Sequence, residues 1–470
     1  MEIVKALNEV FWGWLVAGIL LGTGLFFTIA LGFPQIRDFK KIFSSSAAGV
    51  KREKGVISGF GALCAALGSQ LGTGSLVGVA TALASGGPGA IFWMWMTALL
   101  GMPISFSEAV LAQLYRVKNE DGTYRGGPAY YMERGLGSKL LAGAFSVSLI
   151  AGIGFAYVMA QSNSITNAFI GVVHIPAWVP GLVLAAIVGA VVFGGLTRVV
   201  HFFEVIIPFK AIIYLLLSLW IVIWHLDMFI DVMKLIFTSA FNFESAVGGV
   251  AGHTIKEAFR YGVARGLFSN DAGNGTAPTM HASAVVKHPV QQGFTAMFGT
   301  FLVTCVICSC TAFVILFTGA LDSGTTGILL TEEAFGRGVP YGNLVPFIAM
   351  PLFGFTALVA DIYYAEVNLR WLLPKLKSVP TIYRVLGCLF IIVGSTIPVV
   401  ALWEIVDLFS AIMVFINVIA LLMLVPKVRR AIADYRAQKQ AGVDVPVWDY
   451  DAWNREVEEQ LVLTKAEQPA

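Results

Sequence analysis

Two short segments of the sequence combine glycine with hydroxyl and amide side chains inside long apolar stretches. The first is residues 67–75 (LGSQLGTGS) and the second is residues 268–278 (FSNDAGNGTAP). Glycine in a helix interior costs about 1 kcal/mol relative to alanine, and proline about 3 kcal/mol, so both segments favour local unwinding. An unwound backbone frees N–H groups that can bind a carboxylate and carbonyl groups that can bind a cation. Close helix packing through small residues is the alternative, but two such segments, in corresponding places of two halves of the chain, favour a binding site.

The elements that must position these segments are membrane-spanning helices. Of the 470 residues, 57% are hydrophobic and 13% are charged, whereas soluble domains carry about 25% charged residues. Apolar stretches of about 20 residues, the length that crosses a bilayer, recur along the chain. They predict an all-α integral membrane protein with about eleven transmembrane helices, over residues 10–32, 56–83, 89–115, 140–169, 176–194, 201–225, 256–286, 291–320, 341–373, 380–402 and 403–425.

The positive charges of the predicted loops indicate an orientation. Lysine and arginine gather in the odd-numbered loops and the C-terminal tail and are sparse in the even-numbered loops. Because positively charged loops face the cytoplasm, we expect the N-terminus outside and the C-terminus in the cytoplasm. The predicted domains are a transmembrane part, residues 1–430, with inverted repeats at about 56–225 and 256–425, and a cytoplasmic tail, residues 431–470.

Several long motifs resemble one transporter family. The sequence is similar to the alanine/glycine:cation symporters, within the amino acid–polyamine–cation superfamily, at residues 72–80, 86–95, 124–131, 262–273 and 287–293. The resemblance covers residues from about 10 to 430, the whole membrane part. It implies the leucine-transporter fold, with two inverted five-helix repeats preceded by one extra helix and with the second and seventh helices broken. It also implies sodium-coupled uptake of alanine or glycine by alternating access, in the plasma (inner) membrane of a prokaryote.

The resemblance further implies which residues bind the transported species. The positions that match the family's substrate site are Thr73, Gly74, Gln161, Phe268 and Asn270. Sodium, the coupling ion, is expected between the second and ninth helices, at Leu71, Gly74 and Thr356.

The chemistry of an amino acid fits these positions. Thr73 and backbone N–H groups near Gly74 can satisfy its carboxylate, and Gln161 and freed carbonyl groups near Leu71 or Phe268 can satisfy its ammonium. The ring of Phe268 can cap a small apolar side chain and limit the pocket. Gln161 is equally compatible with a hydrogen bond that merely joins two helices.

The ninth predicted helix departs from the family pattern. The family usually has a second threonine where this chain has Ala357 and a tryptophan where it has Asp361. These positions are four apart and share one helix face, and a carboxylate inside the membrane indicates function. Three interpretations of Asp361 stay open: an ion pair with a cation such as Lys210, a substrate-binding group that attracts an amine, or a ligand or relay for the coupling ion.

The sequence predicts a transporter and not an enzyme. It contains no phosphate-binding loop, hydrolase triad or zinc signature, and its charges form no nucleic-acid-binding stripe. The expected partners are an amino acid, a coupling cation and the lipid bilayer, with no cofactor and no metal beyond the transported cation. Alternatives are the same fold with a larger or cationic amino acid as substrate or with proton coupling, and a sensor that binds an amino acid without transporting it.

Overall fold

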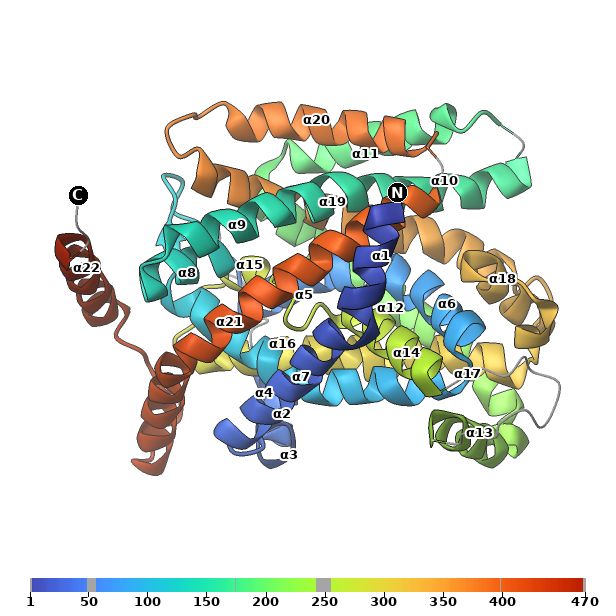
Figure 1. The fold of residues 1–470 in the computed structure, drawn as a ribbon, viewed down its shortest axis with the longest axis horizontal. Helices are drawn as coiled ribbons and strands as arrows, with labels where there is room; N and C mark the ends of the chain where they lie inside the picture. Colours follow the sequence, from blue (N-terminus) through green and yellow to red (C-terminus); the bar gives the residue numbers. More distant parts are fainter. Residues whose placement is uncertain (1, 49–55, 174, 242–254, 398, 468–470) are drawn as a thin grey trace.

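The computed structural model describes residues 2–48, 56–173, 175–241, 255–397 and 399–467. Within these ranges the chain is helical almost throughout (Figure 1). Its two short strands, β1 (Val117–Lys118) and β2 (Tyr124–Arg125), pair antiparallel between two helices.

The N-terminal region is one long helix followed by two short ones. α1 (Glu2–Val10), the π-helical η1 (Phe11–Leu15) and α2 (Val16–Ala30) follow one another without a loop. Phe33, with φ of 55°, turns the chain into α3 (Pro34–Arg37), and α4 (Phe39–Ala48) follows. Proline suits the first position of α3 because that position needs no N–H partner.

The region of the first predicted repeat contains the first interrupted helix. Ser58 caps its start, since the Ser58 hydroxyl accepts a hydrogen bond from the Gly61 N–H at 2.9 Å. The elements are α5 (Gly59–Gln70), η2 (Thr73–Ser75), α6 (Val77–Gly86), α7 (Gly89–Leu114), α8 (Pro128–Leu136), α9 (Lys139–Leu149), η3 (Ile150–Tyr157), α10 (Val158–Val173), α11 (Trp178–Val192) and α12 (Gly195–Trp224).

The second region contains the other interrupted helix and ends in the C-terminal helices. Its connector consists of η4 (Leu226–Met228) and α13 (Phe229–Phe241). The elements that follow are α14 (Ile255–Asn270), α15 (Ala277–His281), α16 (Pro289–Thr300), η5 (Phe301–Cys308), α17 (Ser309–Phe317), η6 (Ala320–Ser323), α18 (Gly327–Gly338), α19 (Leu344–Leu372), α20 (Val379–Gly394), α21 (Val399–Gln440) and α22 (Tyr450–Glu467).

Helices of the two regions pack against each other rather than forming separate bodies. α7 packs against α14 and α16, α5 packs against α12 and α19, and α10 packs against α19 and α20. The interrupted helices, α5–α6 and α14–α15, therefore lie among helices of both regions.

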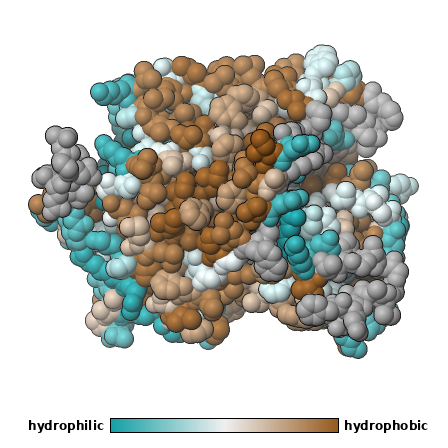
Figure 2. All heavy atoms as spheres, in the orientation of Figure 1, coloured by the Kyte–Doolittle hydropathy of each residue, from teal (hydrophilic) through white to brown (hydrophobic). Residues whose placement is uncertain are grey.

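The surface has the pattern of a protein embedded in a bilayer. Figure 2 shows hydrophobic side chains over the central part of the visible face, with hydrophilic side chains mainly toward its left and right ends. Among the described residues, six helical stretches are long and apolar enough to cross a membrane, and shorter apolar helices include α2, α6, α11 and α20. A multi-pass arrangement follows from these helices.

The predicted ranges coincide with helical segments of the described chain, although some boundaries differ, and the number of eleven transmembrane helices stays a prediction. α20 ends at Gly394 rather than near residue 402, and the last helix begins at Val399. That helix continues to Gln440, so the first ten residues of the predicted tail, 431–440, extend a membrane helix. Its interior proline, Pro426, does not end it, which agrees with the tolerance of proline in membrane helices.

Candidate substrate and cation site

The first interruption lies between α5 and α6. α5 ends at Gln70, and Thr73–Ser75 forms a 3-10 turn before α6 begins at Val77. Gly72 has no room for a side chain, because an added Cβ would lie 2.9 Å from the Ser69 carbonyl oxygen and 3.0 Å from Gln161 Nε2. The glycine thus lets the backbone and the Gln161 amide approach closely.

The second interruption lies between α14 and α15. After α14 ends at Asn270, Asp271 adopts the left-handed region at φ of 57°, and Gly273 and Gly275 also have positive φ, 87° and 84°. The buried carboxylate of Glu108 accepts a hydrogen bond from the Gly273 N–H at 3.1 Å. This bond satisfies a donor that the interruption has freed.

The two interrupted helices contact each other where α5 and α14 end. Gln70, the last residue of α5, donates from its amide to the carbonyl oxygen of Asn270, the last residue of α14, at 2.8 Å. Gly74 faces Phe268, since a Cβ added to Gly74 would lie 3.1 Å from the ring and 3.3 Å from the Phe268 carbonyl oxygen. The freed backbone groups of both helices therefore border one small region.

Buried polar atoms without hydrogen-bond partners gather at this region. Among the described residues no partner exists for Thr73 Oγ1, either amide atom of Gln161, Asn270 Nδ2 or Asp361 Oδ2. All four side chains are fully buried, with 0% relative exposure. Buried polar groups are normally hydrogen-bonded, and each exception calls for a function or a ligand.

Gln161 reaches the first interruption from α10. Its Nε2 faces Gly72, and its Oε1 lies 3.7 Å from the position that a Cβ on Gly354 of α19 would take. The structure therefore brings Thr73, Gly74, Gln161, Phe268 and Asn270 to one place; that they bind the substrate stays a prediction.

Three aromatic rings form a cluster beside the same region. Phe268 is half-buried, and its ring centroid lies 5.1 Å from that of Tyr157 and 5.2 Å from that of Trp403, with edge-on contacts. Next to them, Arg265 forms an ion pair with Asp407 at 3.3 Å, and its guanidinium lies 5.8 Å from the Phe268 ring. Sequence reasoning missed Tyr157 and Trp403, because only packing between distant segments shows which aromatic residues meet Phe268.

Asp361 contacts α5 rather than Lys210. Its Oδ1 accepts a hydrogen bond from the Ser69 hydroxyl at 3.1 Å, while no described residue partners Oδ2. Among the described residues Lys210 and Asp361 form no ion pair, so the first of the three interpretations is not realised. The other two, a substrate-binding group and a ligand or relay for the ion, stay predictions.

Lys210 forms hydrogen bonds with two of the residues that were expected to bind sodium, Leu71 and Thr356. Its ammonium donates to the Leu71 carbonyl oxygen at 3.0 Å and to Thr356 Oγ1 at 2.5 Å. The Thr356 hydroxyl donates to the Gly68 carbonyl oxygen at 3.0 Å. Leu71 and Thr356 thus both contact the Lys210 ammonium. One interpretation of the sequence had instead paired Lys210 with Asp361. The signal for this ammonium was present, because Lys210 is an uncommon charge in an apolar stretch.

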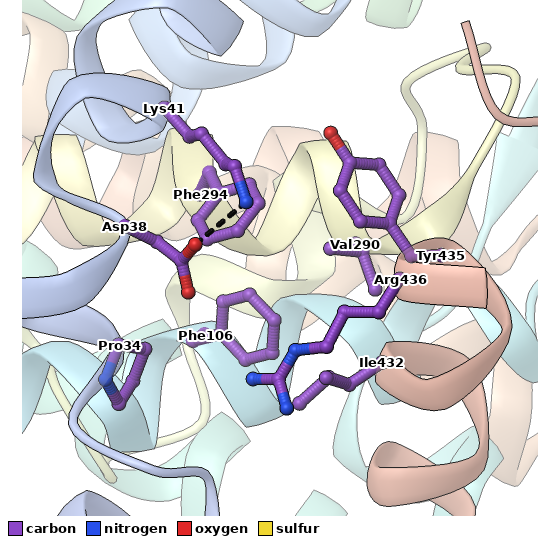
Figure 3. Close-up of a pocket in the computed structure, with 9 residues that line it drawn as sticks. All are labelled: Pro34, Asp38, Lys41, Phe106, Val290, Phe294, Ile432, Tyr435 and Arg436. Carbon is purple, nitrogen blue, oxygen red and sulfur yellow. Dashed lines mark hydrogen bonds and ion pairs between the residues drawn. The ribbon is translucent and has the colours of Figure 1, made fainter. Parts of the chain in front are cut away.

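A separate small hollow lies among α3, α4, α7, α16 and α21 (Figure 3). Asp38 there pairs with Lys41 at 2.7 Å. Burial opposes ionisation of Asp38, but its hydrogen bonds with Lys41 and Arg37 outweigh burial and lower its pKa. The interrupted segments contribute no residue to the hollow. Its lining is an interhelical contact of Pro34, Asp38, Lys41, Phe106, Val290, Phe294, Ile432, Tyr435 and Arg436. Within the described ranges, no three His, Cys, Asp or Glu side chains lie close enough to hold a metal ion.

The chain is similar in sequence to sodium-coupled amino-acid symporters. Residues 1–449 match the model of the sodium:alanine symporter family. A probable sodium/glutamine symporter of Bacillus subtilis is 38% identical over 453 residues, covering 96% of this chain and 93% of the relative. A sodium/alanine symporter of Methanococcus maripaludis is 36% identical over 437 residues, covering 90% and 94%.

Solved structures share the fold at low sequence identity. The crystal structure of MhsT in complex with L-phenylalanine aligns with a TM-score of 0.56 at 15% identity, over 80% of this chain and 90% of that one. A manganese transporter of Eremococcus coleocola aligns with a TM-score of 0.52 at 14% identity, over 80% and 81%. The architecture is therefore that of the leucine-transporter fold.

Proposed function

Because the chain belongs to the sodium:alanine symporter family, we propose that it takes up a small neutral amino acid, such as alanine or glycine, together with a cation. It is a multi-pass membrane transporter for amino acids, coupled to a cation, and not an enzyme. One observation supports the location of the substrate, namely the unpartnered buried polar atoms at the two helix interruptions.

These atoms suit the two charged ends of an amino acid. The Thr73 hydroxyl and the Asn270 amide can donate to its carboxylate, and the positive N-terminal end of α6 favours the same group. The Gln161 carbonyl oxygen and the Phe268 backbone carbonyl can accept from its ammonium. Binding then satisfies groups whose burial without a partner costs about 1–3 kcal/mol each.

The packing around Gly74 supports a small side chain on the substrate. A single added carbon at Gly74 would lie 3.1 Å from the Phe268 ring, and Tyr157 and Trp403 pack against that ring. A hydrophobic pocket of this kind separates side chains that differ by one methylene by about 10–200-fold.

Asp361 supports a second candidate substrate, a larger or cationic amino acid. Its Oδ2 has no partner among the described residues and could accept a hydrogen bond from a second amine on the substrate. Family membership does not distinguish the two candidate substrates, since one relative is a probable sodium/glutamine symporter and another is a sodium/alanine symporter.

The same proposal includes the coupling ion, the orientation in the membrane and the parts that move. Kinship makes Na⁺ the first candidate for the coupling ion, and a proton is the alternative. The family resemblance assigns the ion to Leu71, Gly74 and Thr356, but the Lys210 ammonium already contacts the oxygens of Leu71 and Thr356. The positive loops support an N-terminus outside and a C-terminus in the cytoplasm, in the plasma (inner) membrane. Alternating access would move the repeat at about 56–225 against the repeat at about 256–425, with residues 431–470 as a tail.

Uptake into proteoliposomes tests the proposal. Labelled alanine and glycine are offered to the purified protein with an inward Na⁺ gradient, with K⁺ in place of Na⁺, and with an inward proton gradient. We expect accumulation that unlabelled alanine competes away and that Gln161→Met abolishes. Competition by lysine and arginine that is stronger than by alanine, and that Asp361→Asn removes, would establish the second candidate. Binding without accumulation or counterflow would instead indicate a sensor.

A further inference from the structure

We propose that the ammonium of Lys210 is a tethered cation that takes the place of the free coupling ion, so that Na⁺ does not bind between α5 and α19. This inference rests on the proposed function, because it describes how the same transport site is charged. It implies that any Na⁺ dependence of uptake arises at another position.

The place that Lys210 occupies is one that attracts cations. The Leu71 carbonyl follows the last residue of α5, at the negative end of that half-helix. Carbonyl groups of this kind coordinate the coupling ion in transporters with broken helices. The Thr356 hydroxyl on α19 provides a second oxygen. The Lys210 ammonium donates to the Leu71 carbonyl oxygen at 3.0 Å and to Thr356 Oγ1 at 2.5 Å.

The surroundings satisfy an ammonium well. An ammonium has three N–H donors and no acceptor. Two of them point to the oxygens of Leu71 and Thr356, and the ring of Phe353 lies 4.6 Å from Nζ, at a distance where its face attracts a cation. The Thr356 hydroxyl uses its own hydrogen on a backbone carbonyl, at 3.0 Å from Gly68, so its oxygen is free to accept from Lys210.

A free sodium ion would meet a like charge at this position. Lys210 is 3% exposed, and buried like charges repel strongly because little solvent screens them. The neighbouring residue on α19, Ala357, faces Gly72 and supplies a methyl group rather than an oxygen ligand. The ion would therefore have to displace the ammonium from both of its oxygens.

The ammonium is compensated without a direct ion pair. Asp361, on α19, is fully buried and bonds to Ser69 of α5, while Lys210 bonds to the Leu71 carbonyl two residues further along. A buried charge is costly unless another charge or hydrogen bonds compensate it. Here the oxygens of Leu71 and Thr356 and the ring of Phe353 compensate the ammonium.

Direct measurement of sodium binding tests the inference. Radioactive ²²Na⁺ is offered to the purified full-length protein in detergent, in the wild type and in Thr356→Val, Lys210→Met, Ala357→Thr and the double variant Lys210→Met/Ala357→Thr. Folding of each form is checked by its elution as a single species. Labelled alanine binding is measured in parallel in NaCl and in choline chloride.

We expect ²²Na⁺ to bind to the double variant but not to Ala357→Thr, which has the same added hydroxyl and retains the ammonium. Alanine affinity should be equal in the two salts for the wild type and become higher in NaCl by at least about fivefold in the double variant, a typical coupling between two sites. Sodium binding to the wild type that Thr356→Val leaves unchanged belongs to another position and agrees with the inference.

Two results would overturn it. One is saturable ²²Na⁺ binding to the wild type that Thr356→Val removes. The other is a folded double variant that binds no Na⁺, because the ammonium would then not be what excludes the ion. The sodium measurement needs no substrate, so failure of every form to bind alanine would count against the proposed function alone.

Discussion

Two fully buried glutamines should respond oppositely to the same substitution. Gln161 and Gln113 both have 0% relative exposure. No described residue partners either amide atom of Gln161, whereas the amide of Gln113 donates to the carbonyl oxygens of His281 and Ala284, at 2.5 Å and 3.0 Å. Methionine is unbranched and fills nearly the space of glutamine without its polar atoms.

The expected magnitudes follow from these partners. Each buried polar group without a partner costs about 1–3 kcal/mol, so Gln161→Met should stabilise the ligand-free protein by about that amount. Gln113→Met should destabilise it by about 2–4 kcal/mol, because three hydrogen bonds disappear: the two to the carbonyl groups and the one that Gln113 accepts from the Tyr450 hydroxyl at 3.3 Å. A hydrogen bond to a charged group contributes about 1.5–3 kcal/mol, so alanine binding should weaken about 10–150-fold in Gln161→Met.

The assay is thermal unfolding in detergent followed with a thiol-reactive dye. Cys64, Cys308 and Cys310 are buried and free, so they react when the fold opens. The unfolding midpoint should rise in Gln161→Met and fall in Gln113→Met, and added alanine should raise it in the wild type but not in Gln161→Met. Equal destabilisation by the two substitutions, with alanine binding retained, would refute the reasoning and make Gln161 a structural link between helices.

Three further predictions concern neighbouring features of the site. Glu108→Ala should destabilise the protein by about 3 kcal/mol, because it removes the acceptor of the Gly273 N–H and of one Asn417 amide N–H. Ser107→Ala, the control, loses only a bond to the preceding turn and should cost less than about 1 kcal/mol. Thermal unfolding distinguishes the two variants. Asp407→Asn should speed release of labelled alanine about two- to tenfold, because it removes the charge that holds Arg265 beside the aromatic cluster, and exchange of the two charged residues should partly restore the rate. Gly74→Ala should reduce alanine uptake more than glycine uptake, as its Cβ would lie 3.1 Å from the Phe268 ring, and an unchanged ratio would contradict this account of size selection.

The sequence predicts the spans and the interrupted segments because their signals are local. Apolar length and the clustering of glycine with polar residues act within one helix, so α5 stops at Gln70 and α14 stops at Asn270, inside the segments singled out. Boundaries set by packing were less accurate. α21 runs on to Gln440, where it contacts the N-terminal region: Arg436 donates to the Leu31 carbonyl oxygen at 3.2 Å.

Contacts between helices far apart in sequence were beyond local reasoning. The sequence shows that Lys210 lies in an apolar stretch, but nothing local reveals where a long lysine side chain ends. Its ammonium reaches a residue 139 positions away on α5 and one 146 positions away on α19. Only the packing of α12 against both helices decides that it lies on Leu71 and Thr356 rather than on Asp361.

The two interruptions are compensated by side chains of opposite charge. At the first, an ammonium binds the Leu71 carbonyl at the C-terminal end of α5; at the second, a carboxylate, Glu108, binds the Gly273 N–H ahead of α15. Each charge opposes the partial charge of the backbone groups that the interruption frees. Because Lys210 is covalently part of α12, α5 cannot move away from α12 without losing that compensation. We therefore expect α5 and α12 to move as one unit during transport. The motion that opens the site would then lie between this unit and α19, and it would break the bonds of Thr356 to Lys210 and Gly68 and the bond of Ser69 to Asp361.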